Sequence, residues 1–281
     1  MRTISLRSLT LACLASGLLL TTACKRDNEV TPDDVTTAED RSEDNLETAI
    51  SADIMTSAKP QDATVNNSPA VAGALELRRI YGTCATRTYD AATKTLTIDF
   101  GPTNCLCPDG RSRRGKIIVV FTSDTPTRRA GAVVTRDNYF VNDNQHTATR
   151  IFTNLGLGSF SVEVPSASII RANNGGTHSW TASWTFTQTA GYGTAVTADD
   201  VYSVTGSATG TNRKGVGYTT TIQTPLIKRG DCYKYYVAGT ISITNTNSKA
   251  MLLNYDPSGS QACDNTASVT VNGNTRTITL R

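Results

Sequence analysis

Most of the chain alternates apolar and polar residues with a period of two, which is the pattern of β-strands. The clearest stretch is residues 179–187, where Trp180, Ala182, Trp184 and Phe186 share one face and serines and threonines take the other. Similar stretches occupy residues 95–100, 201–208, 217–222, 237–243 and 267–271. Because the connections are short, the pattern predicts an antiparallel β meander of about fourteen strands. We expect it to form a curved sheet, a sandwich or a barrel.

Turn residues separate these strands. Asn272-Gly273 is the strongest hairpin signal, because a type I′ turn needs positive φ at both central positions. Residues 117–121 are apolar without interruption, so we expect that strand to be buried on both faces. The antiparallel β domain is assigned to residues 73–281.

One segment before this domain has helical periodicity. In residues 38–58, Leu46, Ile50 and Ile54 form a narrow apolar stripe, and acidic residues crowd the first turns. Thr37 with Asp40 resembles a capping box. We expect this acidic helix to dock its stripe on the β domain. Residues 24–37 are predicted to be a flexible tether and residues 59–72 a linker.

The first 23 residues have the features of an export signal. A positively charged start precedes an uncharged apolar run over residues 9–20, which is shorter than the roughly 20 residues of a membrane-spanning helix. Small residues then lead to Cys24, as in the lipobox of a bacterial lipoprotein signal peptide. We expect cleavage before Cys24 and lipid attachment to its sulfur. The alternative is ordinary secretion with an incidental Cys24.

Charge divides the chain into two parts. Residues 24–74 hold 4 Lys/Arg and 11 Asp/Glu, a net of 4 − 11 = −7, whereas residues 75–281 hold 21 and 13, a net of 21 − 13 = +8. The acidic leader is therefore expected to attract the basic domain, or the basic face to meet an anionic surface. The basic residues are scattered, so no nucleic-acid partner is expected. The expected partner is the membrane, through the N-terminal lipid, with a glycan or another envelope component as a further candidate.

Five cysteines lie in the β region, and an exported protein meets an oxidising environment that favours disulfides. Hairpin geometry pairs Cys84 with Cys105 or Cys107, and Cys232 with Cys263. One cysteine of the Cys105/Cys107 pair is then left over. C-x-C spacing without a following histidine does not suit zinc, so no metal is expected.

Residues suited to catalysis are sparse. The two histidines, His146 and His178, lie about 30 residues apart outside any zinc-hydrolase motif. Asp199-Asp200 is the most suggestive carboxylate pair for a glycosidase, but adjacent residues on a strand face opposite ways. No cofactor motif is present, and we expect no enzymatic activity.

Two groups of residues are candidates for ligand contact. Trp180 and Trp184 could form a sugar-stacking platform, although same-face alternation also suits a core. Arg111, Arg113 and Arg114 form a compact basic turn that could hold phosphate or an acidic glycan.

The whole pattern resembles a group of Bacteroidota lipoproteins of the outer membrane or cell surface that have no established activity. The resemblance spans most of the mature chain and is carried by Cys24, the acidic helix, and residues 107–116, 137–142, 200–202, 210–213 and 263–265. It implies the fold and the location, and no mechanism. The expected function is therefore a non-enzymatic binding or structural role on a lipid-anchored protein of the outer membrane, at the cell surface or facing the periplasm. The alternatives are a glycan-binding module or glycosidase, and a carrier for a lipid or other apolar ligand.

Overall fold

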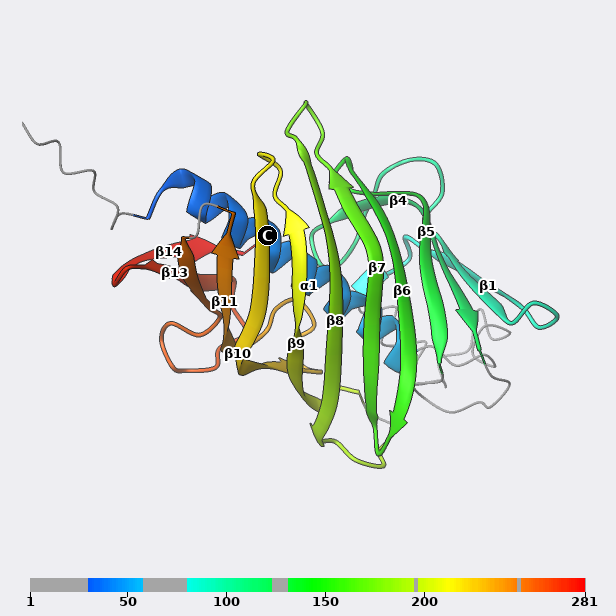
Figure 1. Ribbon diagram of the computed structural model, residues 1–281. Coiled ribbons are helices and arrows are strands. Elements are labelled where there is room, and N and C mark those ends of the chain that lie inside the picture. The colour runs from blue at the N-terminus through cyan, green and yellow to red at the C-terminus, as the bar shows by residue number, and fades with distance from the viewer. Residues whose placement is uncertain (1–29, 58–79, 123–130, 195–196, 247–248, 281) are drawn as a thin grey trace, which may run out of the picture.

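The computed structural model describes residues 30–57, 80–122, 131–194, 197–246 and 249–280 (Figure 1). These residues form one helix, α1 (Pro32–Ser57), and fourteen strands. None of them forms a helix with the length and hydropathy that a membrane crossing requires. The predicted signal peptide, Cys24 and the linker 59–72 lie outside the described residues.

The strands follow one another along the chain with short connections. They are β1 (Thr86–Asp90), β2 (Thr95–Asp99), β3 (Cys105–Leu106), β4 (Ser112–Phe121), β5 (Ala132–Val141), β6 (Asn144–Gly156), β7 (Ser159–Ile170), β8 (Thr177–Ala190), β9 (Val201–Thr211), β10 (Gly217–Arg229), β11 (Ala238–Asn245), β12 (Ala250–Asn254), β13 (Thr266–Val271) and β14 (Asn274–Thr279).

All of these strands belong to one antiparallel sheet. Apart from the short β3, which pairs with β4, the order in the sheet is the order in the chain, from β1 to β14. The end strands β1 and β14 are not neighbours in this order, so the sheet is open. The predicted meander is confirmed, and of the three predicted forms the curved open sheet is the one observed (Figure 1).

The predicted hairpin turns have the expected geometry. Val271 pairs with Asn274, which leaves Asn272 and Gly273 as the two central residues of the last turn. Their φ angles are 47° and 83°, as a type I′ turn requires.

The sheet buries its concave face, and the apolar residues of each strand point there. Phe160, Phe186 and Tyr202 from three neighbouring strands meet in this core, with the rings of Phe160 and Phe186 stacked 4.8 Å apart. Residues 117–121 follow the same alternation, since Ile117, Val119 and Phe121 are buried and Val120 is exposed on the outer face. The expectation that this strand is buried on both faces was therefore wrong.

The helix lies against the concave face, behind the strands in Figure 1. It begins at Pro32, earlier than the predicted residue 38. Thr31 and Asp34 form the capping box: the Asp34 amide donates to the Thr31 hydroxyl, and the Thr31 amide donates to the Asp34 carboxylate at 2.8 Å. The predicted cap, Thr37, lies inside the helix and donates its hydroxyl to the Asp33 carbonyl.

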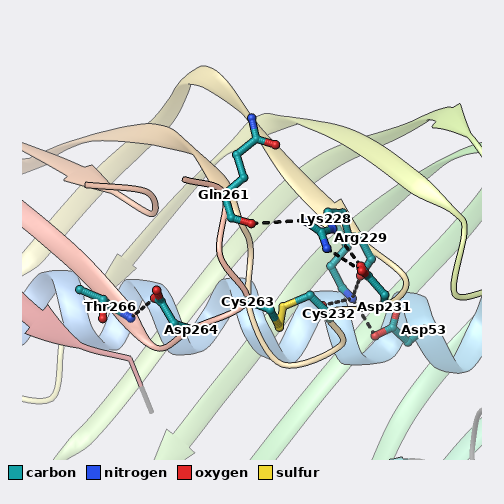
Figure 2. The surroundings of a disulfide bond; sticks show 9 residues. All are labelled: Asp53, Lys228, Arg229, Asp231, Cys232, Gln261, Cys263, Asp264 and Thr266. Atoms are coloured by element: carbon teal, nitrogen blue, oxygen red, sulfur yellow. Dashed lines mark hydrogen bonds and ion pairs between the residues drawn. A yellow bond between two sulfur atoms is a disulfide. The ribbon is translucent and has the colours of Figure 1, made fainter. Parts of the chain in front are cut away.

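Two disulfides join the connections of the sheet. Cys232 bonds to Cys263, as predicted, and Cys84 bonds to Cys105, which is one of its two predicted partners. Figure 2 shows the second bridge beside α1, where Lys228 donates to the Cys232 carbonyl at 3.2 Å. Cys107 is the unpaired member of the five, and it is buried.

Candidate functional site: a charged seam between helix and sheet

A continuous set of ion pairs and hydrogen bonds joins α1 to the concave face, and we call it the charged seam. Its helix members are Asp33, Asp34, Glu39, Asp40, Arg41, Glu43, Asp44, Glu47 and Asp53. Its sheet and loop members are Arg136, His146, Arg150, Arg171, His178, Arg213, Lys214, Tyr218, Lys228 and Lys249. No residue from Asp34 to Met55 is exposed, so most of the seam is inside the molecule, and the Asp33–Lys214 pair lies at its exposed end.

The first part of the seam holds Asp40 between two arginines. Arg213 donates its backbone amide to Asp40 at 2.8 Å and its guanidinium to both Asp40 and Glu39. Arg171 contacts Asp40 at 3.0 Å and also pairs with Glu43. Burial alone would lower the pKa of Arg171, but Glu43 and Asp40 outweigh burial and raise it. In this part of the seam, each of the two guanidinium groups therefore contacts two helix carboxylates.

The middle of the seam is a buried triad of Asp44, His178 and Tyr218. The Tyr218 hydroxyl donates to Asp44 Oδ2 at 2.9 Å and lies 3.0 Å from His178 Nε2, which is 3.1 Å from Asp44 Oδ1. Burial opposes the charged imidazole, but Asp44 outweighs it and raises the pKa of His178. All three side chains are closed to solvent, so the triad holds the helix in place and cannot meet a substrate without helix movement.

The next part of the seam centres on Glu47. Its two oxygens lie 3.6 Å from Arg136 Nη2 and 3.5 Å from His146 Nδ1. Burial raises the pKa of Glu47, but His146 and the nearby arginines outweigh that effect and place it well below its usual value. Arg150 lies deeper, where burial and the charge of Arg136 lower its pKa to about 10. Glu47 thus compensates the charges of two buried arginines, and Asp44 also contributes at Arg150.

Aromatic rings complete the seam. The guanidinium of Arg41 forms an ion pair with Asp44 at 3.1 Å and lies 4.6 Å from the ring centroid of Trp184. The ring of Trp180 stacks on His178 at 4.8 Å. Gly210 opposite has no side chain, and a Cβ there would lie 2.5 Å from the Tyr218 hydroxyl. The glycine gives Tyr218 the room that its contact with Asp44 requires.

The tryptophans therefore belong to the core. Trp180 and Trp184 are 4% and 3% exposed on the face that α1 covers, so the predicted sugar-stacking platform was wrong. The physical reason is that this face is interior, because the sheet curls around the helix. Asp200, the carboxylate of the glycosidase alternative, is also buried and accepts a hydrogen bond from Gln188 at 2.8 Å.

The three arginines of the predicted basic turn lie in separate surroundings. Arg113 is 1% exposed, makes two hydrogen bonds to Asp109 at 2.7 and 2.5 Å and donates to the Tyr139 hydroxyl. Arg114 pairs with Asp143 and lies over Phe140. Arg111 is half-buried near the tip of the same turn. The prediction of a common phosphate-binding turn was wrong for Arg113, because its guanidinium is directed into the protein.

The convex face of the sheet has a shallow groove. One hollow of about 610 Å³ crosses β7 to β11, and a second of about 350 Å³ adjoins it and shares Pro165, Thr181 and Thr209. Serine and threonine account for eight of the fifteen residues that line the first hollow and for four of the ten that line the second. The hydroxyls of Thr181 and Thr209 lie 3.0 Å apart, and Ser183 donates to Glu163 at 2.6 Å. The groove therefore offers neutral hydrogen-bonding groups and one carboxylate.

Comparisons with protein families, curated proteins and solved structures find no match to the chain. No group of three or more His, Cys, Asp or Glu in the described part of the chain is arranged to hold a metal ion.

Sequence reasoning missed most of the seam, although two signals pointed to it. His178 alternates in phase with Trp180 and Trp184, so it falls on the face that was expected to be core, where an imidazole needs a partner. The second signal is the opposite charge of the leader and the domain. The expected attraction between them is confirmed by pairs such as Asp40–Arg171 and Asp33–Lys214.

Proposed function

We propose that the chain is a lipid-anchored protein of the cell envelope with a non-enzymatic binding or structural role, in which α1 is the mooring element. The carrying observation is that the helix nearest the predicted lipid site, Cys24, is held inside the sheet by the charged seam. A force or restraint on Cys24 therefore acts on the folded domain through buried contacts. The resemblance to outer-membrane and surface lipoproteins supports the same proposal.

The length of the tether supports a domain held close to its membrane. From Cys24 to Pro32 there are 32 − 24 = 8 residue steps, which span at most about 29 Å when fully extended. A longer tether would allow the domain to range far from the anchor. Several acyl chains on Cys24 would hold firmly, since each buried methylene contributes about 0.8 kcal/mol.

The use of the ionisable groups supports a non-enzymatic role. Both histidines contact helix carboxylates, and these carboxylates are buried with their partners. Groups that a hydrolase would place at an open site are here engaged in holding α1. The inner face that a lipid carrier would use is covered by α1, so we do not propose that alternative.

Palmitate labelling tests the anchor. In cells that process lipoproteins, the wild type should incorporate labelled palmitate, and Cys24→Ala should not. The control is Cys13→Ala, which changes the cysteine within the apolar run of the predicted signal and should be labelled like the wild type. Protease shaving of intact cells then distinguishes the cell surface from the periplasmic side. An unlabelled wild type, or label that persists in Cys24→Ala, would contradict the anchor.

Glycan binding in the convex groove is a second candidate, favoured by its neutral hydroxyl lining. The change Thr181→Val with Thr209→Val removes one hydroxyl pair and keeps β-branched side chains in both strands. The matched control is Thr270→Val with Thr275→Val, a similar hydroxyl pair at 2.8 Å outside the groove. Loss of glycan-array binding in the first variant alone supports this candidate. No binding by the wild type, or equal binding by both variants, would count against it.

A further inference from the structure

The turn between β6 and β7 combines two unfavourable features at one residue. Gly156 pairs with Ser159, which leaves Leu157 and Gly158 as the central residues of a two-residue turn. Their φ angles are 48° and 77°, so Leu157 is in the left-handed region, which costs a residue with a Cβ. Leu157 is also 92% exposed. The turn therefore places a leucine where both backbone conformation and solvation disfavour it.

The β13–β14 turn of the same chain has residues that adopt this backbone conformation at a lower cost in free energy. It has the same geometry, with Asn272 and Gly273 at the central positions. Among the described non-glycine residues with positive φ, most are Asn or Asp, and Leu157 is the one apolar residue. The cost at Leu157 is therefore specific to this tip, and backbone strain of this kind points to a role for the side chain.

Two further exposed apolar side chains accompany Leu157. Leu155 on the same hairpin is 54% exposed, and Tyr192 on the β8–β9 connection is 59% exposed. Gln188 links the two tips: its side chain lies where a Cβ on Gly158 would be, and its carbonyl accepts a hydrogen bond from the Tyr192 hydroxyl. Both tips lie at the lower end of the view in Figure 1. We call Leu155, Leu157 and Tyr192 the apolar tips.

The sequence around the apolar tips carries no charge. Residues 151–162 and 179–198 contain no Asp, Glu, Lys or Arg. Glycines flank Leu157 and Tyr192 on both sides, so the tips protrude without bulky neighbours. Asp199 and Asp200, at the far end of the β8–β9 connection, accept hydrogen bonds from Thr194 and Gln188. Protruding leucine and tyrosine side chains without an adjacent charge in the sequence suit the boundary of a bilayer, where tyrosine places its ring in the apolar layer and its hydroxyl in the headgroups.

We propose that the apolar tips insert into the surface of a lipid bilayer. The alternative of a protein partner is less favoured, because three side chains form a patch far below the roughly 1,200 Å² of total buried surface that a stable protein interface requires. A bilayer needs no shape complementarity and accepts such a patch. The tips carry no cationic residues, so they have no electrostatic preference for anionic headgroups. A neutral bilayer is therefore sufficient for binding.

This contact would be a second attachment point, and it does not depend on lipid at Cys24. In Figure 1, α1 begins at the upper left, away from the tips. Two separate attachment points fix an orientation, whereas a lipid anchor alone leaves the domain free to rotate. The bilayer contact would orient a domain that the lipid at Cys24 holds near the membrane. Either proposal can fail without the other.

Vesicle flotation tests the proposal on the polypeptide that begins at Lys25. This polypeptide lacks the signal segment and Cys24, and it keeps every residue that the structure describes. It should float with neutral phosphatidylcholine vesicles. Leu155→Asn with Leu157→Asn should weaken its partition at least tenfold, because each leucine contributes burial on insertion. Leu155→Asn with Tyr192→Ser should weaken it similarly.

The matched control is Leu106→Asn, which removes another exposed leucine, 70% exposed on β3. It should float like the parent polypeptide. Asn suits the left-handed position of residue 157, so unchanged tryptophan emission should show that the fold is retained. A parent polypeptide that stays with the soluble fraction, or a Leu155/Leu157 variant that floats as well as the Leu106 control, would overturn the proposal.

Discussion

The charge of Glu47 is the most direct test of the seam. Glu47→Gln keeps the length and shape of the side chain and removes its negative charge. In the native protein this carboxylate faces Arg136 at 3.6 Å and His146 at 3.5 Å, and all three side chains are almost fully buried. Arg150 also depends on it electrostatically. The substitution leaves buried guanidinium groups with reduced compensation.

Removing one partner of a buried ion pair typically costs about 3–5 kcal/mol, because the remaining charge stays desolvated. Since Glu47 serves more than one cation, we expect its loss to fall within this range. For a domain of this size the corresponding decrease in Tm is roughly 6–20 °C. The control is Asp33→Asn on the same helix. Asp33 is 65% exposed and pairs with Lys214, which is 47% exposed, so its loss should cost about 0–1 kcal/mol.

Urea unfolding with the disulfides intact measures both variants. The sequence has two tryptophans, and both lie beneath α1 on the concave face. Tryptophan emission therefore reports helix docking, and far-ultraviolet circular dichroism reports the sheet. If Glu47→Gln costs no more than Asp33→Asn, the seam does not stabilise the fold as argued. Early loss of the tryptophan signal, with the sheet intact, would show that α1 undocks before the sheet unfolds.

Three further predictions concern protonation and sulfur. Asp44 raises the pKa of His178 against the effect of burial, so the stabilisation from His178 is complete below pH 6.5 and declines as the pH rises through the raised value. His146 lowers the pKa of Glu47 against the effect of burial, so that contribution is present above pH 4.5 and is lost as the pH falls through the lowered value. Unfolding free energies measured from pH 2 to 9 should peak between these limits, and a flat profile would contradict both assignments. Cys232→Ala with Cys263→Ala should lower the unfolding free energy by about 2–4 kcal/mol, and an unchanged urea midpoint would argue against that bridge in the native protein. Burial raises the pKa of the Cys107 thiol, so iodoacetamide should label it only after unfolding, and fast labelling of the native protein would refute its burial.

The strands could be predicted from the sequence because each one carries its own evidence. Trp180, Trp184 and Phe186 alternate with small polar residues within one strand, and the Asn272-Gly273 turn is local. The disulfide pairing also followed from local hairpins. These features depend on contacts between neighbouring strands, which the order of residues displays directly.

The start of the helix was missed because the capping pattern occurs twice. Thr-x-x-Asp fits both Thr31–Asp34 and Thr37–Asp40, and the second was chosen because it adjoins the apolar stripe. Pro32 distinguishes the two, since proline is favoured at the first position of a helix and disfavoured inside one. With Pro32 taken as the first helical residue, the acidic run becomes helical throughout.

The seam itself is not visible in any local window. A helix that is charged on most of its surface is usually exposed, and only its apolar stripe was expected to dock. Its partners lie far along the chain, with 131 residues separating Asp40 from Arg171. Alternation placed Trp180 and Trp184 on one face, but only the curl of the sheet decides whether that face is inside. Long-range pairing and sheet curvature are therefore what the sequence does not reveal.

The charged contacts of α1 also bear on its register, that is, on which helix residue faces which residue of the sheet. The helix acids repeat so closely that a shift of four residues would place Asp40 at the position of Asp44 and Glu43 at that of Glu47. Such a shift would keep carboxylates at the positions of Asp44 and Glu47, but it would put Val35 and Thr36 at those of Glu39 and Asp40 and so remove their ion pairs. Arg41 opposes it, because its guanidinium would leave Trp184 and take the position of Asn45, whose amide donates to the buried Tyr255 hydroxyl at 2.7 Å. Arg41 is the one basic residue of α1, and its contacts oppose the shifted register together with the ion pairs of Asp40 and Glu39.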